Sequence, residues 1–194
     1  EYRKRLGASL AKESHVNSDL IVPVPDSGVP AAIGYAAEVK KNIELGIIRN
    51  HYVGRTFIEP TQHIRSLGVK LKHSINKTLI KNKSLVLIDD SLVRGTTSVK
   101  IIKMLYEFGA KEVHLRIASP PIKYPDYYGV DTPTKEELLA SKLDLEEMRK
   151  FINATTLQFL SIEGLYKSMG IEKRNTSYPQ FTDHCFTGEY PVEP

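Results

Sequence analysis

Short apolar runs that alternate with stretches of helical periodicity are the feature that most restricts the folds open to this chain. Four such runs are rich in valine, isoleucine and leucine: Leu20–Val24, Leu45–Ile48, Leu85–Asp89 and Val113–Ala118. Uninterrupted runs of this kind are typical of strands that are buried on both faces of a parallel sheet. Because strands that alternate with helices form α/β folds, we predict a doubly wound, mainly parallel sheet.

The segments between these runs have the spacing of amphipathic helices. A charged, helix-like stretch, Tyr2–Lys12, precedes the first run. The next helix would bury Val29, Ala32, Ile33, Ala36 and Ala37, with Ser27 as a candidate N-cap and Pro30 in its first turn. A third would carry Val99, Ile102, Leu105 and Tyr106 on one face and end at Gly109.

Beyond Ser119 the chain changes to Pro-Pro turns and short helices. Their starts are indicated by a capping box from Thr134 to Glu137, by the acidic stretch Asp144–Glu147, and by an N-cap at Ser161. Leu160 and Leu165 could form a hydrophobic staple there, and Gly170 could end that helix. We therefore expect residues 1–174 to form one domain with a helical C-terminal appendage, and residues 175–194 to form an irregular tail.

Composition excludes several other classes of protein. The 194 residues are 41% hydrophobic and 26% charged, which excludes disordered, collagen-like and coiled-coil chains. Cys185 is the one cysteine and cannot form an internal disulfide, and no apolar run approaches the length of a membrane span. We expect a cytoplasmic protein. Its net charge of +4 is spread along the chain, which suits small anionic ligands better than nucleic acid.

Residues 86–98, Val-Leu-Ile-Asp-Asp-Ser-Leu-Val-Arg-Gly-Thr-Thr-Ser, carry most of the information about function. A buried strand presents Asp89 and Asp90 side by side, and a loop through Gly95 then enters a helix whose N–H groups can bind a phosphate. Hydroxyl donors follow at Thr96, Thr97 and Ser98. Adjacent carboxylates repel by about 1 kcal/mol in water and more in a drier cleft, so we expect them to bind sugar hydroxyls or a divalent cation. A phosphorylated sugar could bind through its hydroxyls to the carboxylate pair and through its phosphate to the loop.

A purely structural interpretation exists for each of these residues alone. The two aspartates could begin a turn and the hydroxyl residues could cap a helix, but the whole set is seldom explained in this way. The segment lacks the Walker spacing, and no Gly-x-Gly-x-x-Gly follows a predicted strand. Nucleoside triphosphate hydrolysis and dinucleotide binding are therefore poorly supported.

The strand-Asp-Asp-Ser-x-x-x-Gly-Thr-Thr pattern resembles the phosphoribosyl pyrophosphate (PRPP) motif of type I phosphoribosyltransferases. Four further segments narrow the resemblance to the amidophosphoribosyltransferase family, and they lie at residues 22–36, at 52–58, at 119–122 with 128–131, and at 185–191. The resemblance covers nearly the whole chain. It implies a transferase of purine biosynthesis with a type I phosphoribosyltransferase-like fold.

The resemblance also assigns roles to individual residues. Asp89 and Asp90 would hold the ribose hydroxyls and a magnesium ion, and Arg94, Gly95, Thr96, Thr97 and Ser98 would hold the 5-phosphate. Ser91, between these two groups, would also contact the substrate. Ser27 would contact the metal–pyrophosphate end, although its spacing fits an ordinary N-cap equally well. No catalytic acid or base is evident in the sequence.

A basic, glycine-containing stretch follows the second run. By the resemblance it would act as a lid over PRPP that excludes water, whereas a solvated basic loop is the structural alternative. The lid candidates are Arg49, Tyr52, Gly54, Arg55, Thr56, Lys70 and Lys72.

Departures from the family pattern concern cysteine. Many relatives hold an iron-sulfur cluster on four cysteines, and matching positions here read Asp126, Thr182 and Cys185. One cysteine cannot hold such a cluster, so we expect none.

The resemblance implies transfer of phosphoribose from PRPP to ammonia, with 5-phosphoribosylamine and pyrophosphate as products, in a homo-oligomer. The family's glutamine-hydrolysing half has no counterpart in these residues, so we expect this chain to use ammonia alone. Two other functions stay open: a phosphoribosyltransferase that uses a purine or pyrimidine base, and a PRPP-sensing regulator without turnover. The charge pattern weighs against an RNA-binding regulator.

Overall fold

A computed structural model describes residues 1–50, 73–129, 132 and 134–192. Its central element is a four-stranded sheet in the order β1-β4-β5-β6, formed by β1 (Leu20–Pro23), β4 (Ser84–Asp89), β5 (Glu112–Ile117) and β6 (Thr156–Phe159). Every neighbouring pair in this sheet is parallel. The predicted fold class and three of the four predicted strands are therefore confirmed.

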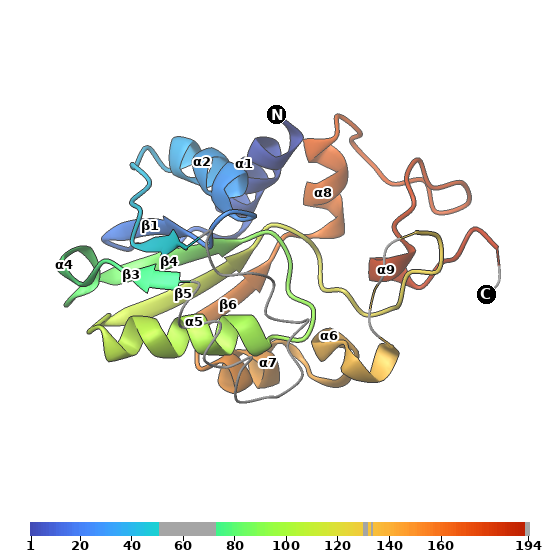
Figure 1. Cartoon of the computed structure of the whole chain (residues 1–194). Coiled ribbons are helices and arrows are strands. Elements are labelled where there is room, and N and C mark those ends of the chain that lie inside the picture. The colour runs from blue at the N-terminus through green and yellow to red at the C-terminus, as the bar shows by residue number, and fades with distance from the viewer. Residues whose placement is uncertain (51–72, 130–131, 133, 193–194) are drawn as a thin grey trace.

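Helices cover both faces of this sheet (Figure 1). One face carries α1 (Tyr2–Ser14), α2 (Val29–Glu38) and α8 (Ile162–Ser168), and the other carries α5 (Thr96–Glu107) and α7 (Leu145–Ile152). The central strand β4 is buried at all six positions, with Val86 and Ile88 in the core under α1 and α2 and with Leu85 and Leu87 in the core under α5. This division follows from the alternation of side chains along a strand.

Two glycines allow α1 and α2 to pack with their backbones in contact. A Cβ placed on Gly7 would lie 1.8 Å from the carbonyl oxygen of Ala31, and one on Gly34 would lie equally close to that of Lys4. The close approach turns α2 so that Tyr35 is buried and Ile33 is 37% exposed. The predicted buried face of α2 was therefore partly wrong, because helix contact and not the apolar count sets its rotation.

The predicted strand Leu45–Ile48 is not part of the parallel sheet, so its prediction as a buried parallel strand is wrong. The structure has β2 (Ile47–Arg49) paired antiparallel with β3 (His73–Ile75), in a separate two-stranded sheet that the short helix α4 (Lys77–Ile80) follows. Leu45 and Ile48 are both more than half exposed. Ile47 alone of its large apolar side chains is buried in the core, and the run pairs with β3 instead of continuing the parallel sheet.

The C-terminal appendage contains one strand that the sequence pattern did not reveal. Strand β6 has only four residues at the edge of the sheet, and in it polar Thr156 and Gln158 alternate with apolar Leu157 and Phe159. Along the chain, η2 (Lys135–Glu137, a 3₁₀ turn), α6 (Leu139–Lys142) and α7 precede β6, and α8 follows it. The helix α9 (His184–Thr187) lies in the tail. No helix among the described residues is both long enough and apolar enough to span a membrane.

Helix starts in the appendage follow the predictions in two of three cases. Asp144 forms a capping box with Glu147 at the start of α7, and Ser161 accepts the Gly164 N–H at the start of α8. Thr134 makes no side-chain cap at η2, so the capping box predicted there is wrong. Its partner Glu137 instead binds Arg94, and this long-range ion pair replaces the local one.

Candidate functional site

The candidate site lies where the parallel strands β1 and β4 end. Asp89 is the last residue of β4, and Ser27 lies in the loop that connects β1 to α2. In open α/β sheets, ligands bind at the carboxyl ends of the strands, often where helix N-termini converge. The fold therefore brings together two loops that lie more than 60 residues apart in sequence.

Asp89 is held by hydrogen bonds at the bottom of this site. Its Oδ1 accepts the Ser27 hydroxyl at 3.3 Å and the Asp90 N–H at 2.8 Å, and the residue is only 9% exposed. Burial and the neighbouring charge of Asp90 raise the pKa of Asp89 to about 7. Since Ser27 donates to Asp89 and the N-cap of α2 is Gly28, the N-cap prediction for Ser27 is wrong.

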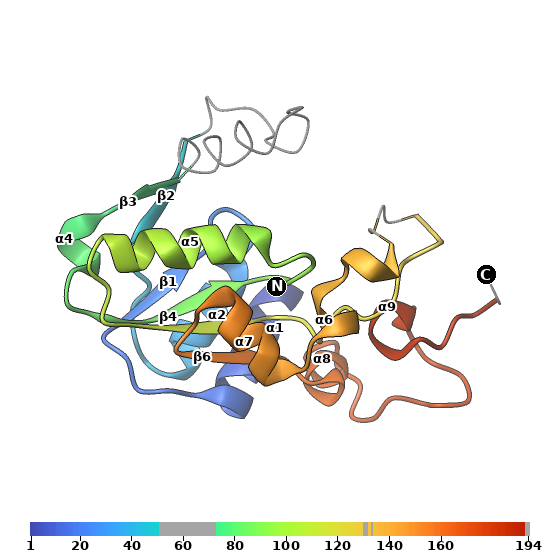
Figure 2. The ribbon, with the colours of Figure 1, turned by 90° about the horizontal axis from the view of Figure 1, so that it is seen from below.

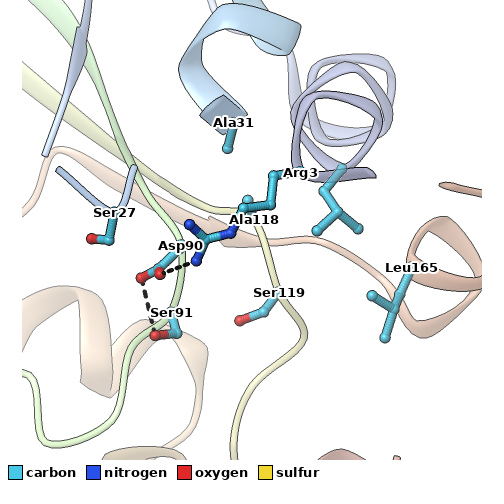
Figure 3. Close-up of a pocket in the computed structure, with 9 residues that line it drawn as sticks. Arg3, Ser27, Ala31, Asp90, Ser91, Ala118, Ser119 and Leu165 are labelled. Carbon is cyan, nitrogen blue, oxygen red and sulfur yellow. Dashed lines mark hydrogen bonds and ion pairs between the residues drawn. The ribbon is translucent and has the colours of Figure 1, made fainter. Parts of the chain in front are cut away.

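Asp90 faces an open pocket and is paired with Arg3 of α1. The Arg3 Nη2 lies 3.0 Å from Asp90 Oδ2, and the Ser91 hydroxyl donates to Asp90 Oδ1 at 3.1 Å (Figure 3). The pocket has a volume of about 160 Å³ and is otherwise lined by Leu6, Ser27, Ala31, Ala118, Ser119 and Leu165. It combines an apolar wall with a ring of hydroxyl and carboxylate groups.

Arg3 is the site residue that sequence reasoning missed. It stands four residues before Gly7 and seven before Leu10, both of which are buried, so it shares the inward face of α1. This helical spacing is the sequence signal from which an inward-facing Arg3 could be predicted. Nothing local links Arg3 to Asp90, however, because the two residues lie 87 positions apart.

The predicted phosphate loop runs from Asp90 into the N-terminus of α5. Gly95, the N-cap of this helix, has a left-handed backbone with φ of +74°, a conformation that glycine adopts without the strain of a Cβ. Thr96 and Thr97 are exposed at the start of the helix, whereas Ser98 is buried. The first turn thus leaves backbone N–H groups and two hydroxyls accessible to an anion.

Arg94 of this loop forms an ion pair with the appendage. Its Nε donates to Glu137 Oε2 at 2.6 Å, so in this structure the guanidinium is directed toward the appendage. Both side chains are about half exposed.

The lid candidates lie almost entirely outside the described residues. This applies to Tyr52, Gly54, Arg55, Thr56, Lys70 and Lys72. Arg49, at the end of β2, is described, and its Nη1 lies 2.7 Å from Asp26 Oδ2. The end of β2 is therefore tied to the loop that contains Ser27.

The chemistry of these groups fits a magnesium ion bound together with a substrate. Among the described residues, no group of three or more His, Cys, Asp or Glu side chains could hold a metal by itself. Mg²⁺ is commonly bound by one or two carboxylates, with substrate oxygens and water completing its octahedron. Asp89, Asp90 and the Ser27 hydroxyl supply hard oxygen donors of this kind, and burial together with the Asp90 charge raises the pKa of Asp89.

A second polar cluster joins the segment after β5 to the tail. The Cys185 carbonyl accepts the N–H groups of Lys123 and Tyr124, and His184 Nε2 lies 2.8 Å from Asp126 Oδ2. Burial and the Asp126 charge raise the pKa of the Cys185 thiol to about 11. Asp126 and Cys185, two of the positions that the family resemblance compares with cluster cysteines, thus belong to one network.

Comparison with known proteins identifies the class to which this fold and site belong. Residues 3–124 match the phosphoribosyl transferase domain family, and the chain belongs to that family. It is similar, more particularly, to the amidophosphoribosyltransferases of Rhizobium etli and Bacillus subtilis, with 62% and 51% identity over 98% of its length. The chain spans only 38% and 40% of the length of these two relatives.

Solved structures agree with this assignment. The chain superposes with a TM-score of 0.87 on glutamine PRPP amidotransferase from B. subtilis complexed with ADP and GMP, at 51% identity. The match covers 99% of this chain and 42% of that one. The resemblance to the amidophosphoribosyltransferase family is therefore confirmed.

Proposed function

We propose that this chain binds PRPP with Mg²⁺ and transfers its phosphoribosyl group to ammonia, which is the first committed step of purine biosynthesis. The observation that carries the proposal is the pair Asp89 and Asp90 at the end of β4, directly before the helix N-terminus at Gly95. This order places acceptors for a sugar diol next to donors for a phosphate. The high sequence identity of the chain to amidophosphoribosyltransferases supports ammonia as the acceptor.

The residues of this chain would act mainly by binding and positioning. Asp89 and Asp90 would accept the ribose 2- and 3-hydroxyls, and the N–H groups around Gly95, with Thr96 and Thr97, would hold the 5-phosphate. Nitrogen would then bond to C1 of the ribose while the bond from C1 to pyrophosphate breaks, with inversion. Bound Mg²⁺ would supply charge neutralisation for the pyrophosphate. We assign no general base.

The proposal extends to partners of the chain. A glutamine-hydrolysing domain would deliver the ammonia, as the greater length of the relatives suggests, and the protein would assemble as a homo-oligomer. The proposed compartment is the cytoplasm, since the one cysteine, Cys185, requires no oxidising surroundings.

Calorimetric titration of PRPP into the chain, with and without Mg²⁺, tests the substrate. We expect Mg²⁺-dependent binding that Asp90→Asn weakens by about 1–3 kcal/mol, the range for a lost charge-assisted hydrogen bond. Glu172→Gln, at an exposed position outside the site, is the control and should bind like the parent. If Asp90→Asn binds PRPP as tightly as the parent, the assignment of the carboxylate pair is wrong.

A further inference from the structure

The loop between β4 and α5 is held from outside by the helical appendage. In the described chain, the Val93 carbonyl accepts the Leu139 N–H at 2.9 Å, and Arg94 binds Glu137 at 2.6 Å. Both partners lie at the junction of η2 and α6, which Figures 1 and 2 show beside this loop. The loop that we propose to bind the 5-phosphate therefore depends on residues more than 40 positions later in the sequence.

Side chains of the appendage contact this loop at Gly95. A Cβ built on Gly95 would lie 2.8 Å from Leu139 Cδ2 and 3.3 Å from Phe151 Cε1. These two side chains therefore occupy the space directly against the N-cap of α5. Their contact would limit the movement of the peptide groups around Gly95, to whose N–H groups the proposed function assigns the 5-phosphate.

The appendage is itself firmly anchored, so it can act as a support. Leu139 and Ile152 belong to the same buried cluster as Leu92 of the loop and Ile101 of α5. Phe151, in contrast, is 49% exposed and lies outside that cluster. A large aromatic side chain at an exposed position adds little to the core, and its position against Gly95 gives it a role at the site.

We propose that Glu137, Leu139 and Phe151 are positioning residues that hold the phosphate loop in its binding conformation before the ligand arrives. Arg94 then serves as the loop's anchor to Glu137 and not as a phosphate ligand. Preorganisation of this kind improves affinity because a loop that is already ordered loses less conformational freedom on binding. The inference rests on the proposed function, since it concerns the same 5-phosphate subsite.

Two probes separate this effect from a general loss of structure. Ribose 5-phosphate carries the 5-phosphate, whereas Mg²⁺ with inorganic pyrophosphate would bind at the other end of the site, near Ser27. By calorimetry, Phe151→Ala should weaken ribose 5-phosphate binding by about tenfold and leave pyrophosphate binding unchanged. Phe151→Leu, which keeps an apolar side chain there, should restore most of the affinity. Leu145→Ala, at an exposed apolar position of the same helix, is the matched control.

Whether Glu137→Gln weakens or strengthens ribose 5-phosphate binding tests the role of Arg94. If Arg94 anchors the loop, Glu137→Gln should weaken ribose 5-phosphate binding by about threefold to tenfold, and Glu136→Gln at the neighbouring exposed position should have no effect. Tighter binding by Glu137→Gln would mean that Glu137 competes with the phosphate for Arg94, and would overturn the inference.

Three other outcomes also have defined meanings. Unchanged binding of ribose 5-phosphate to Phe151→Ala, or an equal loss of both probes, would overturn the inference and leave the proposed function intact. If the parent chain binds neither PRPP nor ribose 5-phosphate, the proposed function fails, and this inference fails with it. In parallel steady-state assays, the positioning role predicts a raised KM for PRPP with kcat within about twofold of the parent.

Discussion

Asp89 and Asp90 stand side by side at the end of β4 although their charges repel. Asp90 has Arg3 as a counter-charge at 3.0 Å, whereas Asp89 is buried and is held by the Ser27 hydroxyl and the Asp90 N–H, which are both uncharged donors. Burial and the nearby Asp90 charge therefore raise the pKa of Asp89. At the scale of single residues, we therefore expect the ligand of this pair to bring positive charge and hydroxyl groups.

The ligand-free chain should therefore be more stable when Asp89 is uncharged. Its folded pKa, about 7, lies above that of an unfolded aspartate, so the folded state binds the proton more tightly. Stability should then fall as pH rises from about 4 to about 7, and Asp89→Asn should raise the free energy of unfolding at pH 8 by about 1–3 kcal/mol. Urea unfolding of parent and variant at pH 5 and pH 8 measures both effects.

Glu172→Gln serves as the control for this experiment, because Glu172 is an exposed carboxylate away from the site. It should change stability by less than about 0.5 kcal/mol at either pH. An Asp89→Asn variant that is less stable than the parent at pH 8 would show that the carboxylate contributes to folding, against this interpretation.

Among the elements, the pair α1 and α2 fixes the position of Arg3 relative to Asp90. Gly7 lies one turn after Arg3, and it approaches the backbone of Ala31 so closely that a methyl group cannot fit. We expect Gly7→Ala to lower the free energy of unfolding by about 2–4 kcal/mol, since backbone cannot move aside as a side chain can. Lys4→Ala, at an exposed position of α1, should have little effect. Chemical denaturation that gives the same midpoint for Gly7→Ala and the parent would disprove the close approach of the two helices.

The link between α8 and the tail depends on a buried ion pair. Arg174 donates to Asp183 and to Glu189, and the Tyr166 hydroxyl of α8 also donates to Asp183. Burial acts to raise the pKa of Asp183, but hydrogen bonds from Arg174 and Tyr166 outweigh it and leave that pKa below its usual range. The charged form of Asp183 is therefore the form that stabilises the fold.

Asp183→Asn should lower the free energy of unfolding by about 3 kcal/mol at pH 7, because it leaves Arg174, whose side chain is only 11% exposed, partly uncompensated. The stabilisation should be lost in the parent as pH falls below about 4, the usual pKa of an unfolded aspartate. Glu189→Gln removes the other, exposed partner of the same arginine and should cost less than about 1 kcal/mol. Equal losses in the two variants, measured by urea unfolding, would contradict this account.

For the whole molecule, local patterns were enough to predict three of the four strands of the parallel sheet and the helices that follow two of them. Leu85–Asp89 is apolar on both faces and leads into a glycine-containing loop, so strand, loop and helix could all be predicted from adjacent residues. The motif at Asp89 and Asp90 was evident for the same reason, and its detailed ligand roles stay a prediction. So does the expected absence of an iron-sulfur cluster.

What could not be predicted depends on contacts between distant segments. The rotation of α2 is set by Gly7 on another helix, and the edge strand β6 is recognisable only beside β5. Likewise, Arg3 reaches Asp90 and Glu137 reaches Arg94 only after the chain has folded. Periodicity describes one segment at a time, and therefore carries no information about these pairs.

The release of pyrophosphate from PRPP on addition of ammonia tests the central claim most directly. With Mg²⁺ and saturating PRPP, we predict release that requires ammonium, increases with pH as ammonium deprotonates, and is strongly reduced in Asp90→Asn. Glutamine in place of ammonium should give only background, because glutamine hydrolysis needs a reactive thiolate and the one cysteine, Cys185, has a thiol whose pKa burial raises to about 11. Pyrophosphate release that is independent of ammonium, or none at any ammonium concentration while PRPP is bound, would contradict the account.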